Sequence, residues 1–334
     1  MKRWRLWLGL LISALFLWLA LRGLNLDEVG ASLREANYGW LVPAGLAYFL
    51  TVGARSWRWT FLLRPVQAVP SRRLFPVVVI GYLGNNIYPF RIGELLRAYL
   101  LRRREGISAG AGLATIFIER IFDGLTILTF VFLALPLAPL PGEGIRSLLL
   151  ASSALFFGAL LFFLALAARP QITLRLLDFF LRFLRPGWRP PVLALGRRFL
   201  SGLASLRDWR TLLLLFLISV AIWLLETAKY WLVMQAFPFA LDFIALLFMN
   251  GVVNLATILP SAPGYVGTFD APGIAVLVLY DVPEALAGAY VLTLHATLWL
   301  PSTLVGLIFM VRAGLSWSDL GRAAKIETTP PDGR

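Results

Sequence analysis

Long apolar runs separated by short polar or basic stretches dominate the sequence. A membrane-spanning helix needs roughly 20 apolar residues, and most of these runs approach or exceed that length. The pattern predicts an all-α integral membrane protein with about six spanning helices. The expected helices cover residues 6–21, 40–63, 107–135, 147–168, 211–237 and 285–311.

Two further apolar stretches are interrupted by proline and glycine. The lead-in to the first break, residues 74–88, has only about 15 residues, which is too short to cross a bilayer. In both stretches asparagines precede the break and an acidic residue follows it. Paired interrupted segments in the two halves of a chain are typical of a transporter site. We therefore predict two re-entrant helical hairpins, residues 74–101 and 243–280. The expected hinge residues are Pro89, Gly93, Pro260, Pro263, Gly264 and Gly267.

The composition supports this prediction and excludes several kinds of chemistry. Hydrophobic residues make up 59% of the chain and charged residues 15%, with a mean hydropathy of +0.77. The net charge of +13 comes from bases in short loops between apolar runs, which indicates membrane topology rather than nucleic-acid binding. With no cysteine and a single histidine, we expect no disulfide, no metal site and no cofactor. No P-loop pattern is present, which argues against direct use of ATP.

The positions of Lys and Arg predict the orientation of the helices. Bases at 64, 72–73 and 102–104 mark a cytoplasmic side, whereas the connections around Asp242 and Asp281 carry no base and are expected outside. Each half then has the order helix, helix, re-entrant hairpin, helix, and the two halves have opposite orientations in the membrane. This is an inverted-topology repeat. The prediction of a repeat is wrong if the second interrupted segment spans the membrane. The repeats cover residues 1–135 and 136–313, and a cytoplasmic tail covers 314–334. Both termini are expected to be cytoplasmic in the cell (inner or plasma) membrane.

Residues 170–207 are rich in arginine and amphipathic. Leu174, Leu177 and Leu181 recur at helical spacing, with Arg175 and Asp178 between them. Such a segment is expected to lie in the cytoplasmic interface, where apolar burial and anionic lipid hold it. A basic linker between the repeats is the simpler alternative.

Several charges lie at membrane depth, where each needs a partner or a wet environment. Glu119 and Asp123 share a helix face, and Arg55, Arg91 or Arg97 are candidate partners. Glu226 and Lys229 are expected to pair, and Arg58 is expected to snorkel to the interface. Structural ion pairs, asparagine caps and a packing role for His295 remain alternatives. The candidate substrate-binding residues are Asn86, Arg91, Glu94, Arg97, Glu119, Arg120, Asp123, Asn254, Asp270 and His295.

Three motifs carry a resemblance to a known family: PFRIGELLR at 89–97, ERIFD at 119–123 and PGYVGTFD at 263–270. They resemble the flippase-like membrane domain of the lysylphosphatidylglycerol synthase family, whose stand-alone members are uncharacterised. The resemblance implies re-entrant helices around a central cavity and movement of an aminoacylated or glycosylated lipid between leaflets. Asp270 stands where the family usually has Glu, and His295 where Arg is common. The aminoacyl-transfer domain of two-domain members is expected to be absent, so lysyl transfer is not inferred.

The motifs and charges together predict a lipid translocase that moves a phosphate-containing lipid, such as an aminoacylated phospholipid or a polyprenyl-phosphate-linked lipid, by alternating access. Arginine suits this role because its planar fork binds phosphate bidentately. An intramembrane enzyme acting on a lipid-linked substrate and a non-transporting, partner-binding membrane protein are the alternatives. A homo-oligomer is compatible with each of the three.

Overall fold

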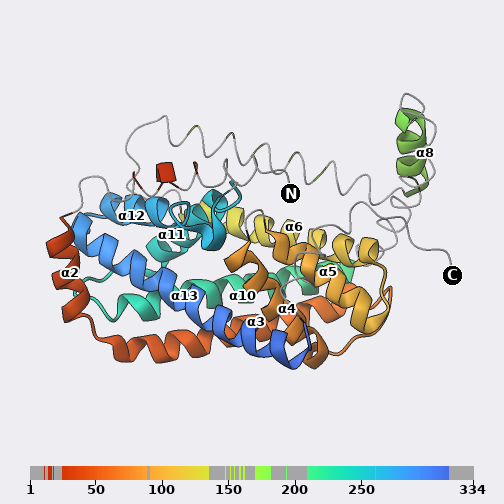
Figure 1. Ribbon diagram of the computed structural model, residues 1–334. Helices are drawn as coiled ribbons and strands as arrows, with labels where there is room; N and C mark the ends of the chain where they lie inside the picture. Colours follow the sequence, from red (N-terminus) through yellow and green to blue (C-terminus); the bar gives the residue numbers. More distant parts are fainter. Residues whose placement is uncertain are drawn as a thin grey trace.

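The computed structural model describes residues 25–88, 91–134, 170–181, 209–259 and 261–315, together with a few isolated positions. The expected runs 6–21 and 147–168, Pro89, Pro260, the segment 182–207 and the tail beyond residue 315 lie wholly or mostly outside the described residues. The described residues form helices, with no strand among them (Figure 1). The elements are α2 (Leu26–Glu35), η1 (Tyr38–Trp40), α3 (Leu41–Leu63), α4 (Ser71–Ile87), α5 (Ile92–Glu105), α6 (Ala109–Ala134), α8 (Pro170–Leu181), α10 (Trp209–Met234), α11 (Phe243–Ala256), η5 (Pro263–Tyr265), α12 (Asp270–Leu279) and α13 (Glu284–Arg312).

Four of these helices are long enough to cross a bilayer. α3, α6, α10 and α13 have 23, 26, 26 and 29 residues, and at 1.5 Å per residue each exceeds the roughly 30 Å of a hydrocarbon core. Within the described residues, two stretches qualify as spans by both length and composition, Arg210–Met234 and Glu284–Arg312. α3 and α6 carry charged residues within their length, and neighbouring helices bury most of these side chains.

The first interrupted stretch folds as a hairpin of two shorter helices. α4 has 17 residues and α5 has 14, and the chain reverses between Tyr88 and Arg91, where Arg91 adopts a left-handed backbone (φ 51°). Gly93 lies directly against Gly81 of α4, so close that a side chain at position 93 would overlap the Gly81 carbonyl. An ion pair between Arg73 and Glu105 (3.3 Å) joins the open ends of the hairpin.

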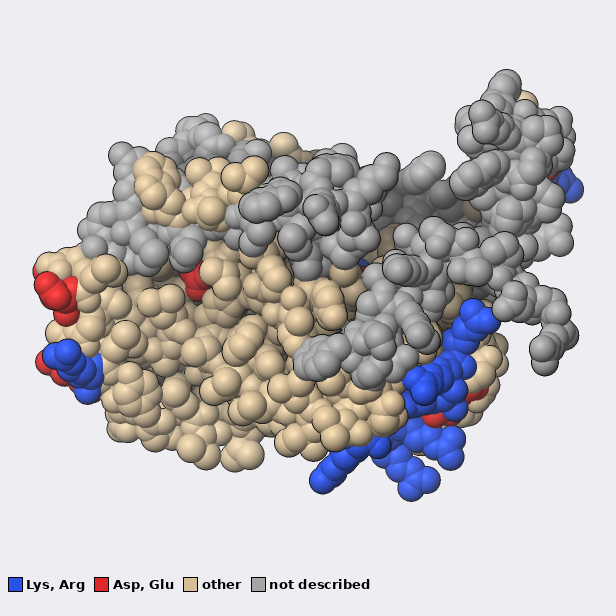
Figure 2. Space-filling view, viewed as in Figure 1, with Lys and Arg blue, Asp and Glu red and all other residues tan. Residues whose placement is uncertain are grey.

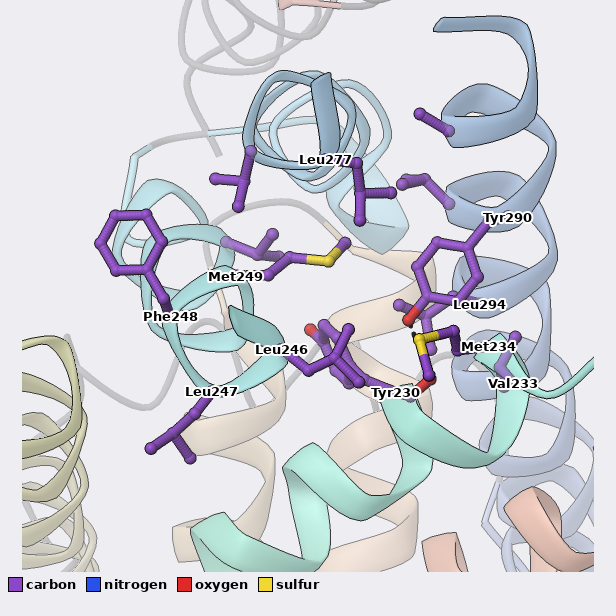
Figure 3. Close-up of a cluster of buried hydrophobic side chains, with 14 of the residues drawn as sticks. Tyr230, Val233, Met234, Leu246, Leu247, Phe248, Met249, Leu277, Tyr290 and Leu294 are labelled. Atoms are coloured by element: carbon purple, nitrogen blue, oxygen red, sulfur yellow. Dashed lines mark hydrogen bonds between the residues drawn. The ribbon is translucent and has the colours of Figure 1, made fainter. Parts of the chain in front are cut away.

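The second interrupted stretch also folds back on itself. α11 and α12 have 14 and 10 residues and are separated by an irregular break from Thr257 to Phe269. Within this break Gly264, Tyr265 and Gly267 have positive φ, a conformation that glycine adopts without strain. α12 packs on α11 and α13 through an apolar cluster in which Leu246, Met249, Leu277, Tyr290 and Tyr230 converge (Figure 3).

The turns of the two hairpins meet inside the protein. The Arg91 guanidinium, at the first turn, donates to the backbone oxygen of Thr257, at the start of the second break (3.1 Å). α4 also contacts η5 of that break and packs along α13. Two apolar cores flank the junction, one built mainly by α3, α4 and α5 and the other mainly by α10, α11, α12 and α13.

Charges on the surface separate toward opposite ends of the molecule (Figure 2). One end carries the exposed arginines of the start of α4 and the end of α5, residues 72, 73 and 102–104. The other carries the exposed acids of α2, Asp27, Glu28 and Glu35, beside one base, Arg34. The surface between these ends is largely uncharged in this view, as expected for a surface that faces lipid.

Candidate functional site: a cation-rich cavity between two hairpin turns

A cavity of about 190 Å³ lies where the two hairpin turns meet α3, α6, α10 and α13. This volume is more than ten times the roughly 10–15 Å³ that one water molecule requires. The cavity can therefore accept a polar group the size of a lipid headgroup fragment, whereas acyl chains would have to lie outside it.

The described wall of this cavity has an excess of positive charge. Two carboxylates, Glu94 and Glu226, line it, against five cations. The cations are Arg55, Arg91, Arg97, Arg120 and Lys229. Aromatic side chains complete the wall and include Tyr48, Tyr82, Trp223, Tyr265, Phe269 and Trp299. An anion entering this space would find more cationic partners than the wall itself neutralises.

Asp123 holds the network together from behind the wall. Its carboxylate accepts from Arg58 (2.7 Å), Arg55 (3.2 Å) and the indole N–H of Trp223 (3.1 Å), and pairs with Arg120 (3.3 Å). These contacts tie α6 to α3 and α10. The expectation that Arg58 snorkels to the interface is wrong: its side chain is fully buried and also donates to Ser219 (2.7 Å). The reason is that α6 and α10 cover this face of α3 and leave the side chain no path to water.

A second buried pair links the first hairpin to α6. Arg97 and Glu119 lie 2.8 Å apart, and the Arg97 guanidinium stacks over the Trp59 ring at 4.1 Å. Glu119 is buried and does not line the cavity, whereas Arg97 reaches the wall. The pair therefore positions a wall cation through a carboxylate that lies behind it.

The cluster at the first hairpin turn is held more loosely. Glu94 lies 3.8 Å from Arg91 and 3.6 Å from Arg120, distances longer than a hydrogen-bonded ion pair. The Nε groups of both arginines have no hydrogen-bond partner among the described residues. The Nε of Arg97, a third wall cation, likewise has no partner in the described part of the chain, so the wall keeps guanidinium donors free for an anion.

Glu226 and Lys229 form the ion pair expected from their spacing. Their charged atoms are 2.6 Å apart, Glu226 also accepts from Arg55 (3.2 Å), and the Lys229 ammonium lies over the Tyr48 ring at 4.6 Å. Both residues line the cavity. The pair therefore belongs to the candidate site, although its sequence spacing favoured a purely structural role.

His295 connects α13 to the second break. Its ring nitrogens contact an Asp270 carboxylate oxygen (2.8 Å) and the Gly264 backbone oxygen (2.7 Å). Because a carbonyl oxygen only accepts, the ring nitrogen facing Gly264 carries a proton, and a second proton is shared between the other nitrogen and Asp270. The backbone N–H of Gly267 donates to the second Asp270 oxygen (2.8 Å). Together these contacts position the break beside the cavity.

The asparagines mainly join elements. The Asn86 amide donates to Ser302 and Thr303 of α13, each at 2.9 Å, while Asn85 accepts from the backbone N–H of Gly93 (2.8 Å) and so caps α5. The Asn254 amide bonds Asn250 within α11. Asn86 and Asn254 nevertheless line the cavity, so these contacts leave the predicted binding role open.

The structure brings all ten predicted site residues to one region. Asn86, Arg91, Glu94, Arg97, Arg120, Asn254 and His295 line the cavity, and Glu119, Asp123 and Asp270 are buried behind the wall. Of the predicted hinge residues, Gly264 and Gly267 have positive φ, Gly93 lies at the α4 contact, and Pro263 begins η5. Arg55, Lys229 and Glu226 were missed as wall residues, and their charge at membrane depth was the signal that could have found them. Among the described residues, no group of three or more metal-binding side chains occurs.

A comparison with known families covers most of the chain. A family model described as the lysylphosphatidylglycerol synthase TM region matches residues 6–306. The chain belongs to this family. The match includes both hairpins and every residue that lines the cavity.

Relatives of this member of the lysylphosphatidylglycerol synthase TM family include archaeal proteins. UPF0104 membrane protein MJ1595 of Methanocaldococcus jannaschii is 23% identical over 90% of this chain and 93% of its own length. A UPF0104 membrane protein of Methanothermobacter thermautotrophicus is 28% identical over 83% of this chain and 86% of its own length. A protein named glycosyltransferase AglD, from Haloferax volcanii, is 26% identical over 86% of this chain but only 51% of its own length.

Proposed function

We propose that this protein translocates a phosphate-containing lipid between membrane leaflets. The observation that carries the proposal is the cavity at the junction of the two hairpin turns, whose described wall holds five cations against two carboxylates. A buried cationic site is costly in a membrane protein unless it serves an anionic ligand or an ion path. The family, named for the synthesis of a lipid with a modified headgroup, supports a lipid as that ligand.

The proposed membrane placement puts the arginine-rich end of the molecule on the cytoplasmic side, following the positive-inside rule. Both ends of the first hairpin then lie at the cytoplasmic face, and both ends of the second lie at the outer face. We place both hairpins as re-entrant elements, because helices of 17, 14, 14 and 10 residues are short for a bilayer. This arrangement is the inverted-topology repeat predicted from sequence, with the N- and C-termini cytoplasmic.

Transport would follow from movement of one half against the other. Each apolar core is built mainly from one half but includes residues of the other, and α3 packs on α10 and α4 on α13 across the two halves. Between the two hairpin turns, the Arg91 guanidinium donates to the Thr257 backbone oxygen. Polar contacts across such a joint are exchanged for contacts with substrate more easily than packed apolar side chains are. The acyl or prenyl chains would remain in the surrounding lipid while the headgroup crosses.

A further part of the proposal concerns α8, which exposes Ile172, Leu176 and Phe179. These side chains recur at three- and four-residue spacing, with Arg175 between them. We place α8 in the cytoplasmic interface, where anionic lipid would bind it.

Leaflet-resolved transport in proteoliposomes tests the proposed function. The panel contains fluorescent phosphatidylglycerol, aminoacylated phosphatidylglycerol, phosphatidylethanolamine and a polyprenyl phosphate. Arg91→Gln and Arg120→Gln are the test variants, because both side chains are partly exposed to the cavity (28% and 32%) and their loss should spare the fold. Arg72→Gln, at an exposed arginine outside the cavity, is the matched control.

We expect movement of at least one phosphate lipid in wild-type and Arg72→Gln vesicles, and a loss of about tenfold or more in both cavity variants, because each removes a charge-assisted contact to phosphate. Folded protein that moves no lipid of the panel above empty vesicles would count against translocation. Equal rates in all variants would show that the cavity does not bind the transported headgroup.

A further inference from the structure

A second cavity of about 180 Å³ adjoins the cation-rich one. The two cavities share four lining residues, Asn85, Arg91, Thr257 and Tyr265. Arg91 thus lies in both walls, where its guanidinium donates to the Thr257 backbone oxygen and lies 5.7 Å from the centre of the Tyr265 ring. A ligand contacting Arg91 in the first cavity would have the second cavity as its immediate neighbour.

The second cavity also has polar side chains in its wall but differs in charge from the first. Tyr88, Ser261 and Tyr265 line it, and their hydroxyls make no hydrogen bond to any other described residue. Arg91 is the one charged side chain among the described residues of its wall. The sequences of the two breaks explain this, since 88–91 (YPFR) and 257–269 (TILPSAPGYVGTF) contain neither Asp, Glu nor Lys.

Hydroxyls without partners, beside a single guanidinium, are suited to a neutral hydroxyl-bearing group. Each protein hydroxyl can both donate to and accept from a ligand hydroxyl. An ammonium group would instead meet the like charge of Arg91 and find no carboxylate in this wall, so its desolvation would go uncompensated.

Apolar side chains mark one rim of the same cavity. Ile258 and Leu259 line it and expose 65% and 46% of their surface. In a membrane, exposed aliphatic side chains contact hydrocarbon without cost. The second cavity therefore adjoins the cation-rich wall and also has exposed aliphatic side chains that lipid chains could cover.

We propose that the second cavity is a subsite for the neutral, hydroxyl-bearing part of a lipid headgroup, a glycerol or sugar attached to the phosphate. The phosphate then sits at Arg91 and Arg120 in the first cavity, and the hydroxyls of the attached group bind Tyr88, Ser261 and Tyr265. This inference rests on the proposed translocation of a phosphate lipid and narrows the substrate to headgroups extended by a polyol rather than by an amine.

Binding to purified full-length protein in detergent tests the subsite, with ligand affinity measured from protection against thermal unfolding. The soluble probes are inorganic phosphate, glycerol 3-phosphate, glucose 1-phosphate and phosphoethanolamine. Glycerol 3-phosphate or glucose 1-phosphate should bind about fivefold to tenfold more tightly than phosphate, as expected for one or two additional hydrogen bonds. Phosphoethanolamine should bind no more tightly than phosphate.

Two variants of the second cavity locate the effect. Ser261→Ala and Tyr88→Phe each remove one hydroxyl from a residue that lines the second cavity alone. Both should abolish most of the gain for the polyol phosphates while leaving the affinity for phosphate unchanged. Tyr48→Phe, the matched change in the wall of the first cavity alone, should keep the gain. Equal affinity for phosphate and the polyol phosphates, or tighter binding of phosphoethanolamine, would overturn the subsite.

A comparison of a lipid probe with a soluble probe distinguishes a lipid ligand from a soluble phosphate ester. Short-chain phosphatidylglycerol should bind more tightly than glycerol 3-phosphate, because its chains cover Ile258 and Leu259. Equal binding of the two would identify a soluble phosphate ester as the ligand and overturn the lipid assignment. If polyol phosphates bind with the predicted preference but no lipid moves in vesicles, the subsite stands and the translocation proposal fails; protection by none of the probes would overturn both.

Discussion

Neutralising Asp123 is the most informative single change for the charge network. In Asp123→Asn the carboxylate becomes an amide of almost the same size, so packing is preserved and charge is lost. Arg55 would retain Glu226 at 3.2 Å, and Arg120 would retain Glu94 at 3.6 Å. Arg58 would retain the Ser219 hydroxyl and a neutral amide oxygen but no carboxylate, and its Nε and second terminal nitrogen already lack partners among the described residues. The cost should therefore arise mainly at Arg58.

The size of the effect follows from the burial of this pair. Removing one partner of a buried ion pair costs about 3–5 kcal/mol, because the other charge remains in a medium of low dielectric. Glu94→Gln is the control at a partly exposed carboxylate with longer contacts, where about 0–1 kcal/mol is expected. Unfolding of purified protein in mixed micelles, followed by circular dichroism during a titration with denaturing detergent, measures both.

A double variant separates loss of charge balance from general damage. Arg58→Met removes the stranded cation and replaces it with an apolar side chain, so Asp123→Asn combined with Arg58→Met should be more stable than Asp123→Asn alone. The reasoning would be refuted if Asp123→Asn unfolds at the same midpoint as Glu94→Gln. A double variant that is less stable than Asp123→Asn would equally contradict it.

Two further predictions concern the contacts that shape the hairpins. Gly93→Ala should destabilise the protein by about 3 kcal/mol or more, because the added methyl overlaps the Gly81 carbonyl. Gly45→Ala in open space on α3 should be neutral or slightly stabilising, and equal unfolding temperatures of these two variants would contradict the close helix contact. Asn86→Ala should cost about 2 kcal/mol by removing its bonds to α13. An unfolding midpoint unchanged from wild type would show that these bonds do not stabilise the joint.

The helices themselves were largely predictable. The expected runs 40–63, 107–135, 211–237 and 285–311 correspond to α3, α6, α10 and α13 within a few residues, because uninterrupted hydrophobicity is a direct signal of a long helix in lipid. The break in each of the two stretches was also predicted, since proline and glycine next to asparagine mark a break inside an apolar run; that the hairpins are re-entrant in the membrane stays a prediction. The hairpin bounds are 71–105 and 243–279 in the structure, close to the predicted 74–101 and 243–280.

The charge pairing was much less predictable. The motif ERIFD showed that bases from elsewhere must meet Glu119 and Asp123, but three arginines were candidates. The structure assigns Arg97 to Glu119, and Arg55, Arg58 and Arg120 to Asp123. The prediction for Arg58 was wrong because the sequence showed how far this residue lies from the end of its helix. It did not show that other helices cover that face of the helix.

By itself, the sequence determined that the chain is a helical membrane protein, where its long helices run, where they are interrupted and which residues carry charge at membrane depth. These properties depend on local composition and length, because each segment in lipid must satisfy its own backbone hydrogen bonds. Only the tertiary structure decided which acid meets which base, that the two hairpin turns meet, and that two cavities lie side by side and share Arg91. Those features depend on contacts between residues far apart in the chain, such as Arg55 and Glu226 at a separation of 171 positions, and no local pattern encodes them.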